Sequence, residues 1–194
     1  MFFVSFAQNR LFMKKAVLVC DGSIDTKFLY SNIGKNDFLV AVDGGANKLS
    51  KTTFVPDLII GDMDSISRGA TKKFRKSEFI RYPMEKDQTD LELALEYCAG
   101  KNFGEIVVLG AFGSRADMNL ANVFCLCRLP KKVKAKIVHE NQEIFLLKNK
   151  TVLFGVPGEK ISFLALNGNV RGLSLEGFLY GLSNSELNAL LVLL

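Results

Sequence analysis

The sequence predicts an α/β protein in which a parallel-sheet α/β N-terminal domain is followed by a smaller all-β, sandwich-like C-terminal domain. Up to about residue 140, short β-rich runs alternate with helix-length segments, and most of these runs are apolar throughout. That pattern is typical of a parallel sheet covered by helices on both faces. From residue 142 onward, closely spaced strand-like runs are separated by turn residues such as Val156-Pro157-Gly158. We therefore expect an α/β domain over residues 13–140 and a β domain over residues 141–194.

The expected strands of the first domain are residues 16–20, 38–43, 57–62, 79–82 and 105–110. Two longer segments show helical periodicity. On residues 88–99 the apolar stripe is Leu91, Ala94, Leu95 and Cys98, and on residues 116–129 it is Leu120, Val123, Phe124 and Cys127. In the second domain we expect strands at 143–148, 152–156, 160–166 and 170–175.

Composition excludes several classes of function. Of 194 residues, 48% are hydrophobic and 23% are charged, which indicates a globular chain. No apolar run approaches the roughly 20 residues of a membrane helix, and no basic stretch is interleaved with aromatic residues, so we expect neither a membrane nor a nucleic-acid partner. The four cysteines form no C-x-x-C motif, and no basic residue leads the apolar start, so we expect a cytoplasmic protein without a signal peptide. Residues 1–12 are expected to be either a mis-set start or a loose extension.

Aspartates follow several of the expected strands. Asp43 ends the second, Asp62 and Asp64 follow the third, and Asp87 and Asp90 follow the fourth at the start of a helix. Because the carboxyl ends of parallel strands form the ligand crevice, we expect these carboxylates to converge. Two like charges about 4 Å apart repel by roughly 4 kcal/mol at an effective dielectric near 20. A group of converging carboxylates therefore needs a cation. Because its ligands are oxygens, without His or Cys, the cation it favours is Mg²⁺.

Each of these residues also has an ordinary structural interpretation. Asp87 is a plausible helix cap, and aspartates are common in turns. Gly44, Gly45 and Gly61 allow backbone N–H groups to approach phosphate, but each also fits a turn. The convergence of separate segments at consecutive strand ends is what favours the functional interpretation.

The fifth expected strand leads into a glycine-containing loop, residues 110–117, that places Arg115 at the start of a helix. The helix dipole would stabilise a structural arginine at the opposite end, so we expect Arg115 to bind phosphate. His139, the only histidine, lies at a strand end outside these motifs, and we expect it to be structural.

Four motifs, in order, resemble the thiamine pyrophosphokinase family: DGGAN at 43–47, PDLIIGDMDS at 56–65, KDQTDLE at 86–92 and GAFGSRAD at 110–117. Residues 158–162 and 173–180 resemble the family's C-terminal β-sandwich. The resemblance implies transfer of a pyrophosphoryl group from ATP to thiamine, giving thiamine diphosphate and AMP.

The resemblance also assigns roles to residues. Asp62, Asp64 and Asp90 match the magnesium and phosphate-site acids, and Asp43, Gly44, Gly45 and Asp87 lie in the same motifs. Thr89 and Arg115 match positions that contact nucleotide phosphates. The family pairs two subunits around a shared thiamine site, which implies a homodimer with Ser174 and Tyr180 facing thiamine. Without the resemblance, the ordinary interpretation of Tyr180 is sandwich core.

Two positions depart from the family pattern. Met118 stands where the family often has histidine. The family also continues past the 177–187 region through further strands, so we expect a short C-terminal β domain.

Two alternative functions stay open: a non-catalytic thiamine- or nucleotide-binding homologue, and another Mg²⁺-dependent phosphotransferase or phosphohydrolase.

Overall fold

The computed structural model describes residues 14–147, 150–166, 168–189 and 192–193. The chain divides into two compact units, residues 1–149 and 150–194.

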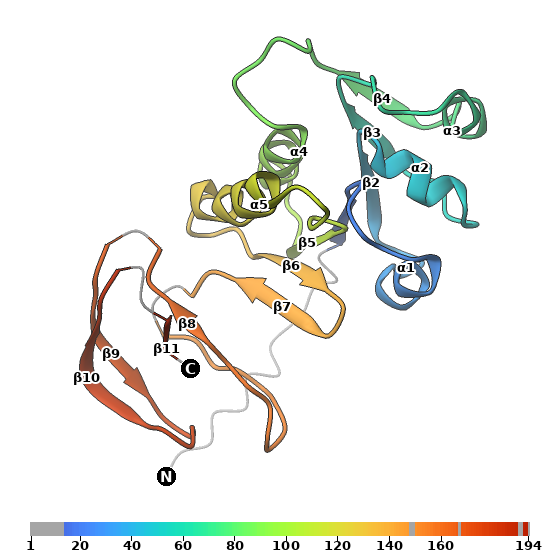
Figure 1. Ribbon diagram of the computed structural model, residues 1–194. Helices are drawn as coiled ribbons and strands as arrows, with labels where there is room; N and C mark the ends of the chain where they lie inside the picture. Colours follow the sequence, from blue (N-terminus) through green and yellow to red (C-terminus); the bar gives the residue numbers. More distant parts are fainter. Residues whose placement is uncertain (1–13, 148–149, 167, 190–191, 194) are drawn as a thin grey trace. The chain divides into compact units, whose positions relative to one another are not determined.

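The first unit is built on a seven-stranded sheet with the order β4-β3-β2-β1-β5-β6-β7 (Figure 1). Six strands run parallel, and only β7 runs antiparallel, along β6. The strands are β1 (Lys15–Val19), β2 (Phe38–Val42), β3 (Leu58–Gly61), β4 (Glu78–Arg81), β5 (Glu105–Leu109), β6 (Ala135–His139) and β7 (Gln142–Phe145). The predicted α/β class is therefore confirmed, and the five predicted strands match β1 to β5.

Helices cover both faces of this sheet. One apolar core packs beneath α1 (Thr26–Asn32), α2 (Gly45–Ser50) and α3 (Arg68–Lys73), and the other packs beneath α4 (Asp90–Ala99) and α5 (Ala116–Arg128). The connections after β1, β2 and β3 thus use one face, and those after β4 and β5 use the other. Strand order reverses between β1 and β5, and the carboxyl edge of an open α/β sheet forms its crevice at such a point. None of the described helices has the length and apolar character needed to cross a bilayer.

The predicted apolar stripe is buried on α4, but most of the predicted stripe on α5 is exposed. On α4, Leu91, Ala94, Leu95 and Cys98 are all buried, as predicted. On α5 most of the predicted stripe is wrong: Leu120 is 62% exposed and Phe124 is 48% exposed, and Cys127 is exposed as well, whereas Val123 is partly buried against the core as predicted. The buried face of this helix is formed by Asn122, Cys125 and Leu126. Apolar residues surround α5 on several sides, so their spacing does not identify the face that packs on the sheet.

The boundary between the units lies later than residue 140. Residues predicted to begin the β domain form β7, which pairs with β6 from His139↔Gln142 to Lys136↔Phe145. An antiparallel strand joined by a tight turn extends the sheet without a crossover helix. The first unit accordingly continues to residue 149.

The second unit contains two small antiparallel sheets. The longer strands β9 (Val170–Leu175) and β10 (Leu182–Leu187) pair with each other, as do the shorter strands β8 (Phe163–Leu164) and β11 (Val192–Leu193). The predicted strand at 170–175 is confirmed, the one at 160–166 shrinks to β8, and residues 152–156 form no strand. Phe163, Ala165 and Leu187 form a small buried core, partly covered by Phe178, whose ring meets that of Phe163 edge-on.

Gly45 sits where α2 meets the sheet, and we predict that Gly45→Ala strongly destabilises the protein. A Cβ atom there would lie 1.8 Å from the backbone oxygen of Val19 in β1, so helix and strand must separate. Overpacking of this kind costs about 1–3 kcal/mol of unfolding free energy. Urea denaturation measures the loss.

The control for this prediction is Gly69→Ala in α3. A Cβ atom at Gly69 meets nothing closer than Ser67 Oγ at 3.9 Å, and alanine favours a helix over glycine by about 0.5–1 kcal/mol. Equal stability of the two variants would show that the close packing at Gly45 is unimportant.

Candidate active site

Three carboxylates meet at the carboxyl edge of the sheet. Asp43 follows β2 directly and has a left-handed backbone with φ of 42°, which turns the chain at the start of α2. Asp62 and Asp64 follow β3. One carboxylate oxygen from each of the three lies within 4.8 Å of the others. The predicted convergence therefore includes Asp43, Asp62 and Asp64.

Asp90 lies beside this group, and a lysine links it to Asp62. Lys86 Nζ lies 3.1 Å from Asp90 Oδ1 and 3.6 Å from Asp62 Oδ2. Only 15% of the Lys86 side chain is exposed, so its ammonium is held within the acidic group. Partial burial lowers the pKa of Lys86, but Asp90 and Asp62 outweigh it, and the net shift is upward. Lys86 is thus a built-in counter-ion that the sequence interpretation did not identify.

Asp43 and Asp62 differ in their electrostatics. The backbone N–H of Asp64 donates to Asp62 Oδ1 at 3.2 Å, and this bond, together with the charge of Lys86, lowers the pKa of Asp62. Burial raises the pKa of Asp43. Its Oδ1 is buried and accepts no hydrogen bond from any described residue. A buried carboxylate oxygen without a donor is costly unless a cation satisfies it.

Three glycines allow the acidic segments to pack closely. Gly61 has φ of 149°, and a Cβ atom there would lie 2.9 Å from Asp43 Cβ and 3.3 Å from Asp90 Cγ. A Cβ atom at Gly44 would lie 2.8 Å from a carboxylate oxygen of Asp21, and Gly45 packs against β1 as described above. Packing within the chain therefore accounts for Gly45 and Gly61, whereas at Gly44 the nearest atoms belong to the Asp21 side chain, which is 54% exposed and can move. Phosphate binding at Gly44 and Gly45 stays a prediction.

Asp21 is a further acidic residue that the sequence analysis missed. It follows β1, the central strand, and lies 3.7 Å from Lys48 Nζ in α2. The rule that singled out Asp43, Asp62 and Asp64, a carboxylate just beyond a parallel strand, applies equally to it.

The structure at the start of α4 contradicts the interpretation of Asp87 as a helix cap. Thr89 is the N-cap, and its hydroxyl oxygen accepts the N–H of Glu92 at 3.2 Å. Asp87 is exposed and lies outside the helix. The capping interpretation of Asp87 is therefore wrong, and one lone pair of the Thr89 hydroxyl is already used by the helix.

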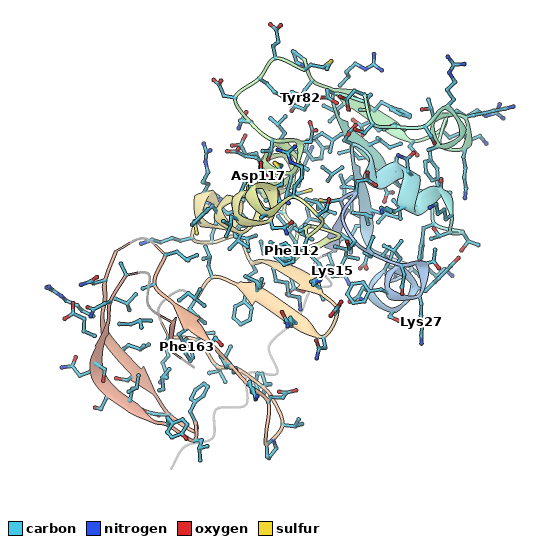
Figure 2. The ribbon with its side chains drawn as sticks, viewed as in Figure 1. Lys15, Lys27, Tyr82, Phe112, Asp117 and Phe163 are labelled. Atoms are coloured by element: carbon cyan, nitrogen blue, oxygen red, sulfur yellow. The ribbon has the colours of Figure 1, made fainter. Side chains whose placement is uncertain are left out.

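Arg115 occupies the N-cap position of α5, where its side chain is exposed. Its Nη2 donates to Asp117 Oδ2 at 2.6 Å and its Nε to Asp117 Oδ1 at 3.3 Å (Asp117 is labelled in Figure 2). These hydrogen bonds raise the pKa of Arg115. An exposed ion pair contributes little to stability, so the guanidinium can change partners at low cost.

The two residues predicted to face thiamine belong to the second unit. Ser174 lies on β9, and its Oγ accepts the N–H of Asn184 at 3.0 Å. Tyr180 is 74% exposed, so its interpretation as sandwich core is wrong. An exposed aromatic ring is available to stack on a ligand.

Comparison with known proteins identifies the family. The model of the thiamin pyrophosphokinase catalytic domain matches residues 30–139, more than half of the chain. The thiamine pyrophosphokinase of Bacillus subtilis (strain 168) is 30% identical over 161 residues, covering 76% of this chain and 72% of that protein. The chain belongs to the thiamine pyrophosphokinase family, and it is an enzyme of that family.

Solved structures of this family share the fold. The thiamine pyrophosphokinase of Bacillus subtilis superposes with a TM-score of 0.80 at 25% identity, covering 91% of this chain and 85% of that one. The thiamin pyrophosphokinase of Geobacillus thermodenitrificans superposes with a TM-score of 0.74 at 25% identity, covering 90% and 83%. The resemblance to thiamine pyrophosphokinases predicted from four motifs is confirmed.

Proposed function

We propose that this enzyme transfers the pyrophosphoryl group of ATP to the hydroxyl oxygen of thiamine, producing thiamine diphosphate and AMP with Mg²⁺ bound at the acidic group. The observation that carries the proposal is the meeting of Asp43, Asp62 and Asp64 within 4.8 Å at the crevice edge of a chain of this family. The four cysteines are free, which supports a cytoplasmic location.

The residues of the acidic group fit Mg²⁺. The donors are carboxylate oxygens, which this hard cation prefers, and the unsatisfied Oδ1 of Asp43 supplies a ligand that needs a positive partner. Asp43, Asp62 and Asp64 would hold the ion. Asp90 joins this set as a proposed ligand if it gives up Lys86. When bound, Mg²⁺ neutralises charge on the transferred phosphoryl groups.

Phosphoryl transfer needs an in-line nucleophile and neutralisation of charge, so the remaining residues have positioning roles. In the proposal, Arg115 contacts the nucleotide phosphates with its planar fork, and Thr89, Asp87 and the backbone at Gly44 and Gly45 border them. A crevice aspartate accepts the proton of the thiamine hydroxyl as its oxygen forms a bond to the β-phosphorus of ATP. The bond between the β-phosphorus and the oxygen that bridges it to the α-phosphate breaks, and this oxygen leaves with AMP.

One assay separates this proposal from the alternatives. The protein is incubated with ATP, Mg²⁺ and thiamine, and the nucleotide and thiamine products are quantified. We expect AMP and thiamine diphosphate in equal amounts. Formation of ADP would favour another phosphotransferase, and binding without turnover would favour a non-catalytic homologue.

Lys86→Met tests the counter-ion. The ammonium repels a cation and competes with it for Asp62 and Asp90, so we predict that the variant binds Mg²⁺ roughly tenfold more tightly by isothermal titration calorimetry. Its metal-free form should also melt at a lower temperature, because the carboxylates lose their partner. Lys35→Met, at an exposed lysine in the connection before β2, is the control. Equal or weaker Mg²⁺ binding by Lys86→Met would contradict the prediction.

We propose that the enzyme is a homodimer in which Ser174 and Tyr180 of one subunit face thiamine held by the other. The exposed ring of Tyr180 supports this, since stacking on an aromatic ring is worth about 1–3 kcal/mol. Tyr180→Ala is therefore expected to weaken thiamine binding by roughly tenfold while leaving ATP binding unchanged. Phe154→Ala, at a ring that is 96% exposed in the same unit, is the control. A monomer by light scattering that keeps full activity would contradict the shared site.

A further inference from the structure

The turn that follows β3 carries two of the three carboxylates of the acidic group. It runs from Asp62 to Ser67, the N-cap of α3. Met63 has a left-handed backbone with φ of 70°, a conformation that a residue with a side chain keeps only where its surroundings hold it. The side chains of Met63 and Ile66 pack against the core, but apolar contacts have no fixed direction. The positions of Asp62 and Asp64 therefore depend on the polar contacts of this turn.

Asn47 in α2 holds this turn with both ends of its side-chain amide. Its Nδ2 donates to the backbone oxygen of Ser65 at 2.8 Å, and its Oδ1 accepts the backbone N–H of Ser67 at 2.9 Å. Because the amide presents its donor on one side and its acceptor on the other, a single orientation of the side chain satisfies both bonds. We call these two hydrogen bonds the amide clamp.

On one side, the amide clamp is tied to the segment that carries Asp43. Asn47 is the third residue of α2, and its backbone N–H donates to the oxygen of Gly44 at 2.9 Å. The N–H of Ala46 donates to the backbone oxygen of Asp43 at 3.0 Å. These bonds join the first turn of α2 to Asp43, so the place of Asn47 is fixed relative to this carboxylate.

On the other side, the amide clamp is tied to Asp62 and Asp64. The hydroxyl of Ser65 donates to Asp64 Oδ1 at 2.7 Å, and the N–H of Asp64 donates to Asp62 Oδ1 at 3.2 Å. A chain of hydrogen bonds thus runs from α2 through the turn to two carboxylates of the acidic group. Groups that hold metal ligands in place typically contribute about 10- to 100-fold to metal affinity or activity.

The spacing of these carboxylates matters to a small cation. Mg²⁺ needs near-ideal octahedral geometry with oxygens at about 2.0–2.1 Å, so two of its ligands lie at most about 4.2 Å apart. One oxygen each of Asp43, Asp62 and Asp64 lies within 4.8 Å of the others. The three oxygens are thus close to binding positions before an ion arrives, and a shift of the turn would lose this preorganisation.

We propose that Asn47 is a positioning residue for the metal: its amide clamp holds the turn of residues 62–67 so that Asp62 and Asp64 stay in place relative to Asp43. The inference rests on the proposed function, because it takes Mg²⁺ as the cation of the acidic group. Asn47 acts through the backbone of the turn and is not itself a ligand.

The competing interpretation is that the amide clamp only stabilises the start of α3. The hydroxyl of Ser67 already caps this helix by accepting the N–H of Ala70 at 3.2 Å, so the helix start has a cap of its own. Both bonds of the amide clamp are exposed to solvent, where a hydrogen bond replaces one to water and adds little to stability. Positioning of the carboxylates therefore accounts for the clamp better than stability does.

The test measures Mg²⁺ binding to the metal-free, full-length protein by isothermal titration calorimetry without nucleotide or thiamine. Asn47→Ala removes the amide clamp, and alanine is a better helix former than asparagine, so α2 should persist. Asn47→Leu also removes both bonds but keeps most of the side-chain volume, which separates hydrogen bonding from packing. Each variant should bind Mg²⁺ about tenfold more weakly than the wild type, while melting no more than about 2–4 °C lower.

The chain offers a matched control in Asn119. Its side chain bonds the N–H and the C=O of Gly113, at 2.9 and 3.0 Å, in an amide clamp on a loop that carries none of the three carboxylates. Asn119→Ala should therefore bind Mg²⁺ as the wild type does. Loss of Mg²⁺ affinity in Asn119→Ala equal to that in Asn47→Ala would show that the effect is not specific to Asn47 and would overturn the inference.

The Mg²⁺ dependence of turnover gives a second measurement that a merely structural role would not change. In Asn47→Ala, half-saturation by Mg²⁺ should rise about tenfold, turnover at saturating Mg²⁺ should return to within a few-fold of the wild type, and the KM for thiamine should stay unchanged. A structural defect would instead lower turnover at every Mg²⁺ concentration without moving half-saturation, and would overturn the inference.

The outcomes also distinguish this inference from the proposed function. Unchanged Mg²⁺ affinity and half-saturation in both Asn47 variants, with Mg²⁺-dependent turnover by the wild type, would overturn the positioning role alone. A wild type that neither binds Mg²⁺ nor depends on it for turnover would overturn both.

Discussion

Asp62→Asn is expected to lower the rate of thiamine diphosphate formation by roughly 10²- to 10³-fold, the cost typical of removing one group that stabilises charge in a transition state. The lowered pKa of Asp62 keeps this carboxylate ionised and available to a cation. Asparagine keeps the shape of the side chain but loses the charge. The same loss is expected for Asp64→Asn, whose carboxylate lies in the same group.

The loss of stability should be small beside the loss of activity. The lowered pKa of Asp62 means that the fold favours its ionised form, so Asp62→Asn loses the attraction to Lys86, but the asparagine oxygen can still accept the N–H of Asp64 and Lys86 keeps Asp90 as a partner. The melting temperature of Asp62→Asn should therefore fall only slightly below that of the wild type. Glu85→Gln, at an exposed carboxylate in the loop before α4, is the matched control and should keep normal turnover. Near-normal turnover of Asp62→Asn at limiting Mg²⁺ would contradict its role as a metal ligand.

Arg115→Lys is expected to cause the second large loss, a fall in turnover of at least tenfold with thiamine binding nearly unchanged. The guanidinium already forms two parallel hydrogen bonds to Asp117, which shows that its planar fork is presented at the start of α5. A phosphate can replace Asp117 in the same geometry, whereas an ammonium offers a single point charge. Steady-state kinetics with ATP and with thiamine varied separately measure the effect.

The control for Arg115 is Arg75→Lys, at an exposed arginine after α3. It preserves the net charge of the protein and alters no crevice residue. Equal kinetics for Arg115→Lys and Arg75→Lys would exclude Arg115 from the site.

Much of the acidic group could be predicted because parallel strands impose a simple geometry. Continuous apolar runs indicate buried parallel strands, and the residues just beyond them must share one edge of the sheet. Asp43, Asp62 and Asp64 were found this way. Lys86 was not, because its role depends on a loop that folds back over the edge, and no periodic pattern specifies the path of such a loop.

Other features depend on packing partners that local sequence does not reveal. The exposed face of α5 was mistaken for the buried one because residues 120–127 are apolar at nearly every position. β7 was assigned to the wrong unit because a short antiparallel strand looks the same in either sheet. The strands of the second unit are short and interrupted by turns, so their limits depend on which edges pair.

The fate of each phosphate of ATP tests the central claim most directly. Separate reactions with [α-³²P]ATP and [γ-³²P]ATP, each with Mg²⁺ and thiamine, are resolved by chromatography. Transfer of an intact pyrophosphoryl group predicts that the α label appears only in AMP and the γ label only in thiamine diphosphate, with the two products equimolar. The appearance of the α label in ADP, or of the γ label in thiamine monophosphate or inorganic phosphate, would contradict it.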